Sequence, residues 1–255
     1  MRKYSLYYDS IAKNYDKIYN CHKVNIMRTV ENKIINNEIN NIIKNNNNNK
    51  NNKNNYLILD IGCGTGEQLK KIKTENVIGL DISYKMAKIA HDKSKKPVVV
   101  GNGEYLPFKN KSFNCVISFF GALNHLEINR VMKEINRILK PNGKVIFTVA
   151  NVYDYRWIIN NIYKKGIKNT KKALTTKKGE IVKYIDNKKI KVKTKFYSIN
   201  EIENIVKKHN FKIKYTFGTN ITNTPLDNLI YKSFLKKYSW YVGIVAIKGN
   251  NKNKI

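Results

Sequence analysis

The stretch LDIGCGTGE, residues 59–67, decides the fold class of this chain. It follows an apolar run at residues 56–59 and precedes a short segment in which polar and apolar residues alternate. A glycine-rich turn between a strand and a helix lets the backbone approach a ligand, and the N-terminus of the helix favours an anionic group. The turn therefore marks a ligand site, whose ligand has to be identified from the residues around it.

The sequence that follows repeats this alternation of strand and helix. Short apolar runs are separated by stretches of helical periodicity, among them residues 83–93 and 125–139. The pattern predicts a doubly wound α/β sheet of mostly parallel strands joined by right-handed crossovers. The strands expected here are residues 56–60, 77–81, 98–100, 115–119 and 144–150.

The spacing of the glycines excludes two common ligands. Gly62, Gly64 and Gly66 follow a G-x-G-x-G pattern, whereas a dinucleotide fingerprint requires G-x-G-x-x-G. A phosphate-binding P-loop ends in G-K-[ST], and here Glu67 follows Gly66. The turn is therefore typical of neither a dinucleotide site nor a nucleoside triphosphate site.

Two carboxylates indicate a different ligand. Asp60 lies at the carboxyl end of the first strand, where it would repel a pyrophosphate and attract an ammonium group. Asp81 lies at the end of the second strand, where a carboxylate typically accepts hydrogen bonds from ribose hydroxyls. An amino acid joined to a ribose is the chemistry of S-adenosylmethionine, and we expect that cofactor.

Five motifs in order give the chain a family resemblance. They are YDSIAKNYDKIY, LDIGCGTG, GLDISYKMAKIA, GNGEYLPFKNKSFNCVIS and EINRILKPNGKVIF. The chain resembles the class I S-adenosylmethionine-dependent methyltransferases, in the broad type 11 group that includes the quinone-biosynthesis methyltransferases. The resemblance covers about residues 4–150, and more loosely 196–248. It implies a Rossmann-like fold with a seven-stranded sheet whose last strand is antiparallel.

The resemblance also implies the cofactor-binding residues. They are Asp60, Gly62, Gly64 and Gly66 for the methionine portion, Asp81 for the ribose, Ile82 and Met86 near the adenine, and Asn102 and Gly103 at the adenine edge. Asn102 stands where the family usually has Asp, but its carbonyl can still accept from the adenine amino group, so we expect weaker or retuned binding. Asn114 also replaces a common Asp. Asn142 replaces a Gly, and its turn should survive because Asn tolerates a positive φ.

The segment before this core, residues 1–43, predicts an N-terminal helical lid. Apolar residues recur at helical spacing in two stretches, about residues 4–18 and 24–43. Residues 44–55 are only asparagine and lysine, which cannot bury a core, and they predict a disordered loop. The cofactor-binding core is then residues 56–150.

The C-terminal part divides into two segments. Residues 151–197 contain thirteen lysines and one arginine, and predict a basic insertion on the acceptor side with a hairpin at 180–185 and 189–196. Residues 198–250 predict a helix and a strand pair that complete the sheet. The helix has a capping box of Ser198 and Glu201, and Asn210 can end it. A helical segment near 226–237 lies between the expected strands, 211–217 and 241–248.

Two residues are candidates for a catalytic role. Tyr15 is either a packing residue or an aromatic face over the sulfonium, held by cation–π attraction. His125 is either a bystander or a general base that also orients the acceptor. Asn124 and Glu127 form a capping-box pattern, which would place His125 at the first helical position. Methyl transfer depends mainly on holding the acceptor in line at roughly 3–3.5 Å, so a base is needed only for acceptors that retain their proton.

Composition and charge limit the kinds of binding partner and the cellular compartment that this chain suits. The net charge is +31, from 49 basic against 18 acidic residues, which indicates either an anionic partner or compositional drift in a chain rich in Lys, Asn and Ile. Three cysteines without a CxxC pattern suggest neither a disulfide framework nor a metal cluster, and a reduced cytoplasmic location fits. We find no signal peptide and no apolar run long enough to span a bilayer.

Three functions follow as hypotheses. The first is a methyltransferase acting on an O, N or C nucleophile of a small molecule, which is the acceptor we favour. The second is an RNA methyltransferase, with tRNA as the obvious substrate, which would use the lysine-rich insertion. The third is a non-catalytic cofactor-binding or RNA-binding protein, motivated by Asn102 and Asn114.

Overall fold

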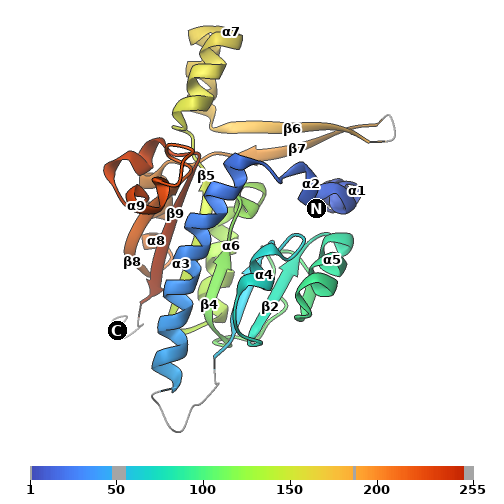
Figure 1. Cartoon of the computed structure of the whole chain (residues 1–255), viewed down its shortest axis with the longest axis vertical. Helices are drawn as coiled ribbons and strands as arrows, with labels where there is room; N and C mark the ends of the chain where they lie inside the picture. Colours follow the sequence, from blue (N-terminus) through green and yellow to red (C-terminus); the bar gives the residue numbers. More distant parts are fainter. Residues whose placement is uncertain (1, 48–55, 186–187, 250–255) are drawn as a thin grey trace.

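A computed structural model describes residues 2–47, 56–185 and 188–249 (Figure 1). Its centre is a seven-stranded sheet with the strand order β3-β2-β1-β4-β5-β9-β8. Strands β1 to β5 pair in parallel, and β9 pairs antiparallel with both β5 and β8, so the predicted fold class is confirmed. The strands are β1 Ile58–Ile61, β2 Val77–Asp81, β3 Val98–Val100, β4 Phe113–Ser118, β5 Leu139–Ala150, β8 Phe211–Thr219 and β9 Tyr241–Lys248.

Helices cover both faces of this sheet (Figure 1). Successive side chains of a strand point to opposite faces of a sheet, so a sheet with apolar residues on both faces needs helices on both. In β1, Ile58 and Leu59 accordingly belong to two separate buried clusters. Ile135 joins the cluster around Leu59, and Ile34 joins the cluster around Ile58. The helices are α6 Ile128–Ile138 and α8 Ile199–Lys208 on the first face, and α3 His22–Asn47, α4 Glu67–Lys71 and α5 Tyr84–Ser94 on the second.

The N-terminal segment is more broken than its periodicity predicts. A 3₁₀ turn, Ala12–Asn14, separates α1, Arg2–Ile11, from α2, Tyr15–Ile18, where we expected one helix. Helix α3 continues to Asn47, so the first residues of the predicted asparagine loop are helical, because an existing helix needs no new nucleus to add a turn. The rest of that loop, residues 48–55, lies outside the described residues.

The lysine-rich insertion forms an arm that stands away from the sheet (Figure 1). It consists of α7, Tyr155–Thr176, followed by β6, Lys178–Ile185, and β7, Lys188–Lys195, which pair as a separate antiparallel ribbon. The hairpin was predicted, although residues 186–187 at its turn are not described. Helix α7 was not predicted, since its apolar residues are interspersed with Asn and Lys and most of them remain exposed.

The C-terminal segment closes the sheet as predicted. The Ser198 hydroxyl caps α8 by accepting from the Glu201 nitrogen, and a Glu201 carboxylate oxygen accepts from the Ser198 nitrogen at 2.8 Å. Asn210 follows the helix with φ of 61°, the left-handed conformation expected of it. The helical segment near 226–237 is two short pieces, α9 Asp227–Ile230 and a 3₁₀ turn Phe234–Tyr238.

Candidate functional site

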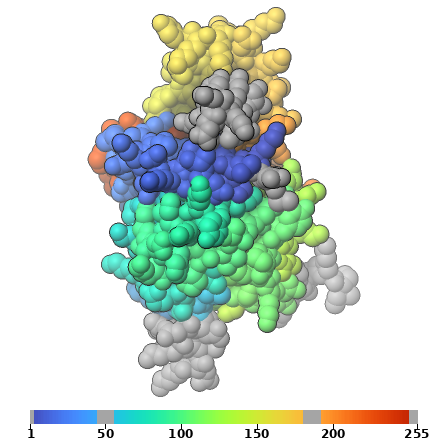
Figure 2. Space-filling view, turned by 90° about the vertical axis from the view of Figure 1, so that its right-hand side faces the viewer, coloured from blue at the N-terminus to red at the C-terminus, as the bar shows by residue number. Residues whose placement is uncertain are grey.

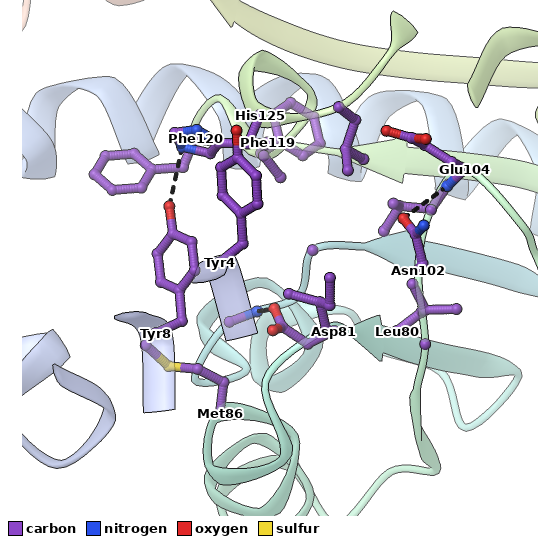
Figure 3. A pocket seen from close by; sticks show the side chains of 18 of the residues that line it. Tyr4, Tyr8, Leu80, Asp81, Met86, Asn102, Glu104, Phe119, Phe120 and His125 are labelled. Carbon is purple, nitrogen blue, oxygen red and sulfur yellow. Dashed lines mark hydrogen bonds between the residues drawn. The ribbon is translucent and has the colours of Figure 1, made fainter. Parts of the chain in front are cut away.

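A cavity of about 260 Å³ opens at the carboxyl ends of the central strands (Figure 3). It lies beside β1, where the chain crosses from β3 to β4, and open α/β sheets bind ligands at such a switch point. Most of the predicted site residues come together here. Those that line the cavity are Tyr15, Gly62, Gly64, Asp81, Ile82, Met86, Asn102, Gly103 and His125.

The glycine turn forms one wall of this cavity. Gly62 and Gly64 have φ of 72° and 55°, which glycine adopts without side-chain strain. A Cβ on Gly64 would have no neighbour within 4 Å, so space remains for a ligand to approach its backbone. Gly66 lines neither this cavity nor a smaller cavity beside it. It faces α5 instead, where a Cβ on Gly66 would lie 2.9 Å from the Ala90 backbone. Its glycine serves the close packing of the turn on α5.

Asp60 borders the smaller cavity, of about 30 Å³, which shares Tyr15 and Gly64 with the first. The carboxyl is 2% exposed, and its Oδ2 has no hydrogen-bond partner among the described residues. Burial and the nearby Asp81 raise the pKa of Asp60 to about 7. A cation in this smaller cavity would supply the missing partner and favour the charged carboxylate.

Asp81 ties together two turns that border the cavity. Its Oδ2 accepts from the Gly64 nitrogen and its Oδ1 accepts from the Ser83 nitrogen, both at 2.9 Å. Burial raises the pKa of Asp81 to about 6, although these backbone hydrogen bonds favour its ionised form. Each carboxylate oxygen has a second acceptor position, so Asp81 can hold this geometry and also accept from a ligand in the cavity.

The far end of the larger cavity is formed by the turn after β3. The Asn102 Oδ1 accepts from the Glu104 nitrogen at 3.0 Å, which fixes the amide at the cavity wall. A Cβ on Gly103 would lie 2.9 Å from Leu126, so only glycine fits there without displacing the wall. Met86, at the start of α5, is buried and also lines the cavity.

Two acidic residues of the N-terminal helices fasten them over the site, and the sequence interpretation missed both. Asp9 accepts from the Ser83 hydroxyl at 2.5 Å and from the Lys85 nitrogen at 3.0 Å, at the start of α5. Asp16 accepts from the Thr65 hydroxyl in the glycine turn at 2.5 Å and pairs with Lys93. The seven-residue spacing of these acids within the first motif was the available signal. Figure 2 shows the N-terminal segment (dark blue) lying across the core.

His125 is held between the lid and the arm (Figure 3). Its Nδ1 lies 3.0 Å from the Lys193 carbonyl, which can only accept, so Nδ1 carries a proton. Its Nε2 lies 3.0 Å from the Tyr8 hydroxyl, and Tyr4 donates to the same Lys193 carbonyl at 3.2 Å. Burial lowers the pKa of His125, so the ring is neutral near pH 7 and Nε2 accepts from Tyr8.

The predicted capping role of Asn124 is wrong. Asn124 and His125 end a 3₁₀ turn, Ala122–His125, and α6 begins only at Ile128 with Glu127 at its N-cap. The Asn124 side chain instead accepts from the Ala150 nitrogen at 3.0 Å and donates to the Lys195 carbonyl. It joins the ends of β5 and β7, a long-range contact that local sequence spacing cannot reveal.

Aromatic side chains occupy the space beside the two cavities. Tyr15, which borders both cavities, has its ring 4.6 Å from that of Tyr19, and Tyr19 contacts Phe120 edge to face at 5.1 Å. Phe120 lies two residues after the end of β4. Its φ of 55° is a costly backbone conformation for a bulky residue. The strained backbone turns its ring toward Trp240 and toward Tyr241, the first residue of β9.

Asn114, Asn142 and Cys63 have structural roles. The Asn114 Oδ1 accepts from the Leu57 nitrogen at 3.1 Å at the start of β1, on the opposite edge from the cavities. Asn142 has φ of 60°, the positive value expected of it, and lies in the first part of β5, where the register with β4 shifts. Cys63 is buried, and burial raises its pKa well above the ordinary value, which disfavours a reactive thiolate. In the described parts of the chain, no cluster of His, Cys, Asp or Glu is suited to hold a metal ion.

Sequence comparison places these features among known proteins. A family model described as "Methyltransferase domain" matches residues 59–147. An uncharacterized protein of Methanocaldococcus jannaschii is 55% identical over 246 residues, which covers 96% of this chain and 91% of that protein. A ubiquinone/menaquinone biosynthesis C-methyltransferase of Wigglesworthia glossinidia brevipalpis is 36% identical over 101 residues. That match covers 35% of this chain and 40% of the enzyme's length.

Solved structures share the fold over nearly the whole chain. An S-adenosylmethionine-dependent methyltransferase of Clostridium acetobutylicum superposes with a TM-score of 0.63 at 14% identity, over 95% of this chain and 99% of the other. The magnesium protoporphyrin IX methyltransferase of Synechocystis, solved with bound SAH, superposes with a TM-score of 0.62 at 15% identity, over 96% and 98%. At these identities the likeness is one of fold.

Proposed function

The chain belongs to the class I S-adenosylmethionine-dependent methyltransferases, and we propose that it methylates an O, N or C nucleophile of a small organic molecule. The observation that carries the proposal is the enclosure of the site. Helices α1 and α2 lie over the cavity. Asp9 and Asp16 accept hydrogen bonds from Ser83 and Thr65, and the Tyr8 hydroxyl bonds to His125, so the helices are fastened to three separate parts of the core. An acceptor has to fit beneath this cover.

The two adjoining cavities suit the two ends of the cofactor. The amino acid end would enter the smaller cavity, where its ammonium group meets the unpartnered Oδ2 of Asp60 and its carboxylate lies near the N-terminus of α4. The open space over Gly64 would allow the methionine side chain of the cofactor to pass from one cavity to the other. The cofactor supplies an electrophilic methyl group on its sulfonium.

The adenosyl end would occupy the larger cavity. Asp81 would accept from the ribose hydroxyls, Ile82 and Met86 would pack on the adenine, and Asn102 with Gly103 would form its edge. Replacing Asp81 by Ala tests this placement: labelled S-adenosylmethionine should bind at least about tenfold more weakly, because two charge-assisted hydrogen bonds are lost. Unchanged affinity would contradict the placement of the ribose.

Tyr15 and His125 would act on the reacting groups. Because Tyr15 borders both cavities, its ring would face the sulfonium of a cofactor that spans them, and cation–π attraction would orient the positive charge. His125 is neutral and its Nε2 accepts from Tyr8. It can receive an acceptor proton at Nε2 once Tyr8 turns aside, or through the Tyr8 hydroxyl as a relay.

The test of the acceptor class is direct. The purified protein is incubated with S-adenosylmethionine labelled in its methyl group and with separated small-molecule, RNA and protein fractions of the source cell. We expect label in the small-molecule fraction, at a rate nearly independent of salt. Label confined to RNA, and suppressed by added salt through counterion competition, would contradict a small-molecule acceptor.

RNA is the second candidate acceptor, favoured by the arm. Thirteen lysines lie in residues 151–197, and the Lys193 carbonyl of β7 in this segment contacts the Nδ1 atom of His125, which lines the cavity. A bound tRNA would therefore contact the arm while a flipped base entered the site. Transfer of label to bulk tRNA with a steep salt dependence is the result that would favour this candidate.

A further inference from the structure

The exposed face of α7 has the composition of a surface-binding helix. Its most exposed apolar residues are Ile159 at 62%, Tyr163 at 89% and Ile167 at 61% exposure, and Tyr155 and Ile162 are also exposed. Figure 1 shows α7 rising beyond the sheet, and Figure 2 shows its segment (yellow) standing clear of the N-terminal segment and the core. Several large apolar side chains on one projecting helix usually mark an interaction surface.

The spacing places these residues on one side of the helix. Tyr155, Ile159, Ile162 and Tyr163 follow the i, i+4, i+7, i+8 pattern of a single helical face. On the opposite side of the helix, Asn161 is buried and its amide donates to the Trp157 carbonyl at 3.0 Å. After a kink at Gly166, which has φ of 78°, Ile167 continues the run of exposed apolar side chains.

Positive charge flanks this apolar face. Helix α7 contains no acidic residue, and Lys164, Lys165 and Lys168 follow the apolar residues directly, with Lys171 and Lys172 one turn further. All five lysines are exposed. A lysine can lay its methylene stem along apolar material and keep its ammonium group in contact with anionic head groups. The combination defines a basic amphipathic helix.

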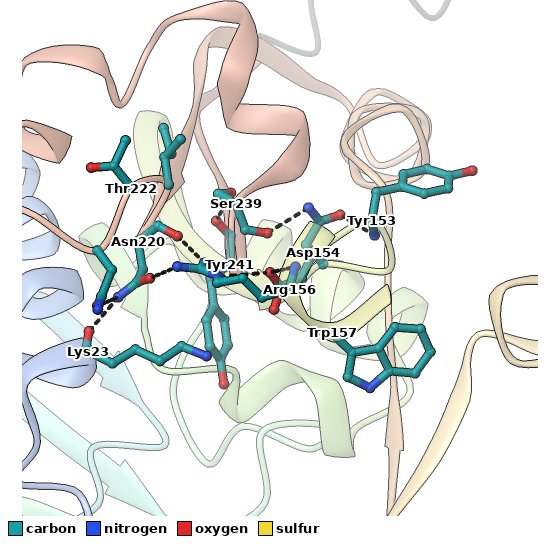
Figure 4. Close-up of polar contacts among 12 residues, drawn as sticks. Lys23, Tyr153, Asp154, Arg156, Trp157, Asn220, Thr222, Ser239 and Tyr241 are labelled. Carbon is teal, nitrogen blue, oxygen red and sulfur yellow. Dashed lines mark hydrogen bonds and ion pairs between the residues drawn. The ribbon is translucent and has the colours of Figure 1, made fainter. Parts of the chain in front are cut away.

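The base of α7 is fixed to the body, so the face is presented in a defined direction (Figure 4). Asp154 caps the helix by accepting from the Arg156 backbone nitrogen at 3.3 Å. The Arg156 guanidinium donates to the side chain and the carbonyl of Asn220, and the Asn220 amide donates to the Lys23 carbonyl at 2.7 Å. Three segments distant in sequence thus hold the first turn of the arm.

We propose that the arm docks this protein on an anionic bilayer surface, with Ile159, Ile162 and Tyr163 entering the boundary between head groups and acyl chains and the lysines of α7 contacting the head groups. The structure contains no helix, among the described residues, long and apolar enough to cross a bilayer. The contact is therefore peripheral. It does not depend on which molecule accepts the methyl group.

The aliphatic residues decide between a bilayer and a nucleic acid. An RNA surface would use the lysines, and could stack a base on Tyr163, but it gives no reason to expose Ile159, Ile162 and Ile167 to solvent. A bilayer accounts for both features, because burial of aliphatic side chains and attraction to anionic lipid add to one binding free energy.

The proposal is tested by sedimentation of the full-length protein with vesicles. Vesicles of equimolar phosphatidylcholine and phosphatidylglycerol should bind the protein at least about tenfold more tightly than phosphatidylcholine alone, because of the five lysines. The double variant Ile159→Ser, Ile162→Ser should bind the mixed vesicles at least about tenfold more weakly. The matched control, Ile159→Leu with Ile162→Leu, keeps the apolar area and should bind like the original protein.

Further measurements keep the outcomes separate. Circular dichroism and binding of labelled S-adenosylmethionine should be unchanged in all variants, because α7 contributes no residue to either cavity. Equal vesicle binding by the serine and leucine variants would overturn the proposal. So would binding of tRNA without binding of vesicles, or light scattering that shows a dimer dissociated by the serine substitutions, since these results would assign the face to RNA or to a second copy.

Discussion

Replacing Asp60 by Asn should stabilise the protein without ligand while it weakens cofactor binding. The carboxyl is buried with an unpartnered oxygen, and its pKa rises from 3.8 to about 7 because ionisation is costly there. The unfolded chain releases this proton at lower pH than the folded chain. Stability from the protonated carboxyl is therefore complete below about pH 4 and is lost as pH rises toward and through 7.

The size of the effect follows from this difference in pKa. Each tenfold change in proton affinity corresponds to about 1.4 kcal/mol, so the folded state of the original protein loses about 4 kcal/mol by about pH 8. At about pH 5.5 the loss is about 2 kcal/mol, because the unfolded state is then ionised and the folded state is not. An Asn has nearly the same shape and no charge, so the variant should escape both losses.

Urea denaturation of both proteins at these two pH values measures the effect. The free energy of unfolding of Asp60→Asn should exceed that of the original protein by more at about pH 8 than at about pH 5.5. Glu31 and Asp81, whose burial raises their pKa values to about 8 and about 6, titrate in both proteins, so the comparison retains only the part of their titration that depends on the charge of Asp60. A difference that stays constant with pH would refute the reasoning, as would unchanged binding of labelled S-adenosylmethionine by the variant.

Three other substitutions test separate parts of the site. Gly66→Ala should lower the free energy of unfolding by about 2 kcal/mol in urea denaturation, because its φ of 82° strains any side chain and its Cβ would meet the Ala90 backbone; stability equal to the original would contradict this. Asp16→Asn should speed dissociation of labelled S-adenosylmethionine severalfold in a filter-binding chase, because its bond with Thr65 is weakened; an unchanged rate would mean that α2 does not retain the cofactor. His125→Gln should lower kcat at least about tenfold without changing cofactor affinity, because glutamine cannot receive the acceptor proton. A normal kcat would contradict a role for His125 as general base.

The core of the fold was predictable because its signals are local. The order of strands and helices from Ile58 to Ala150 follows from apolar periodicity, and the capping box at Ser198 follows from spacing alone. Helix α7 was missed for a physical reason: its apolar face is not buried in the chain, so the pattern that marks a core helix is diluted by lysine and asparagine.

In the site, only the residues at the strand ends and in the glycine turn were predictable from the sequence. Strand ends and the glycine turn identify Asp60, Asp81 and Gly64 because the fold places such residues at one edge of the sheet. The bonds of Asp9 to Ser83 and of Tyr8 to His125 join residues 74 and 117 positions apart. The spacing of Asp9 and Asp16 could single out these two acids, but the partners of the N-terminal residues depend on how their helices pack on the core.

The Lys193 carbonyl accepts hydrogen bonds from Tyr4 of the lid and from His125 of the site, while its own strand belongs to the arm. One backbone oxygen thus links three parts of the molecule. Binding free energies between linked parts are reciprocal. If these hydrogen bonds stabilise the arm in its position, they stabilise the lid in its position by the same amount. A shift of β7 relative to the core would therefore alter the hydrogen bond that holds the proton of His125 on Nδ1.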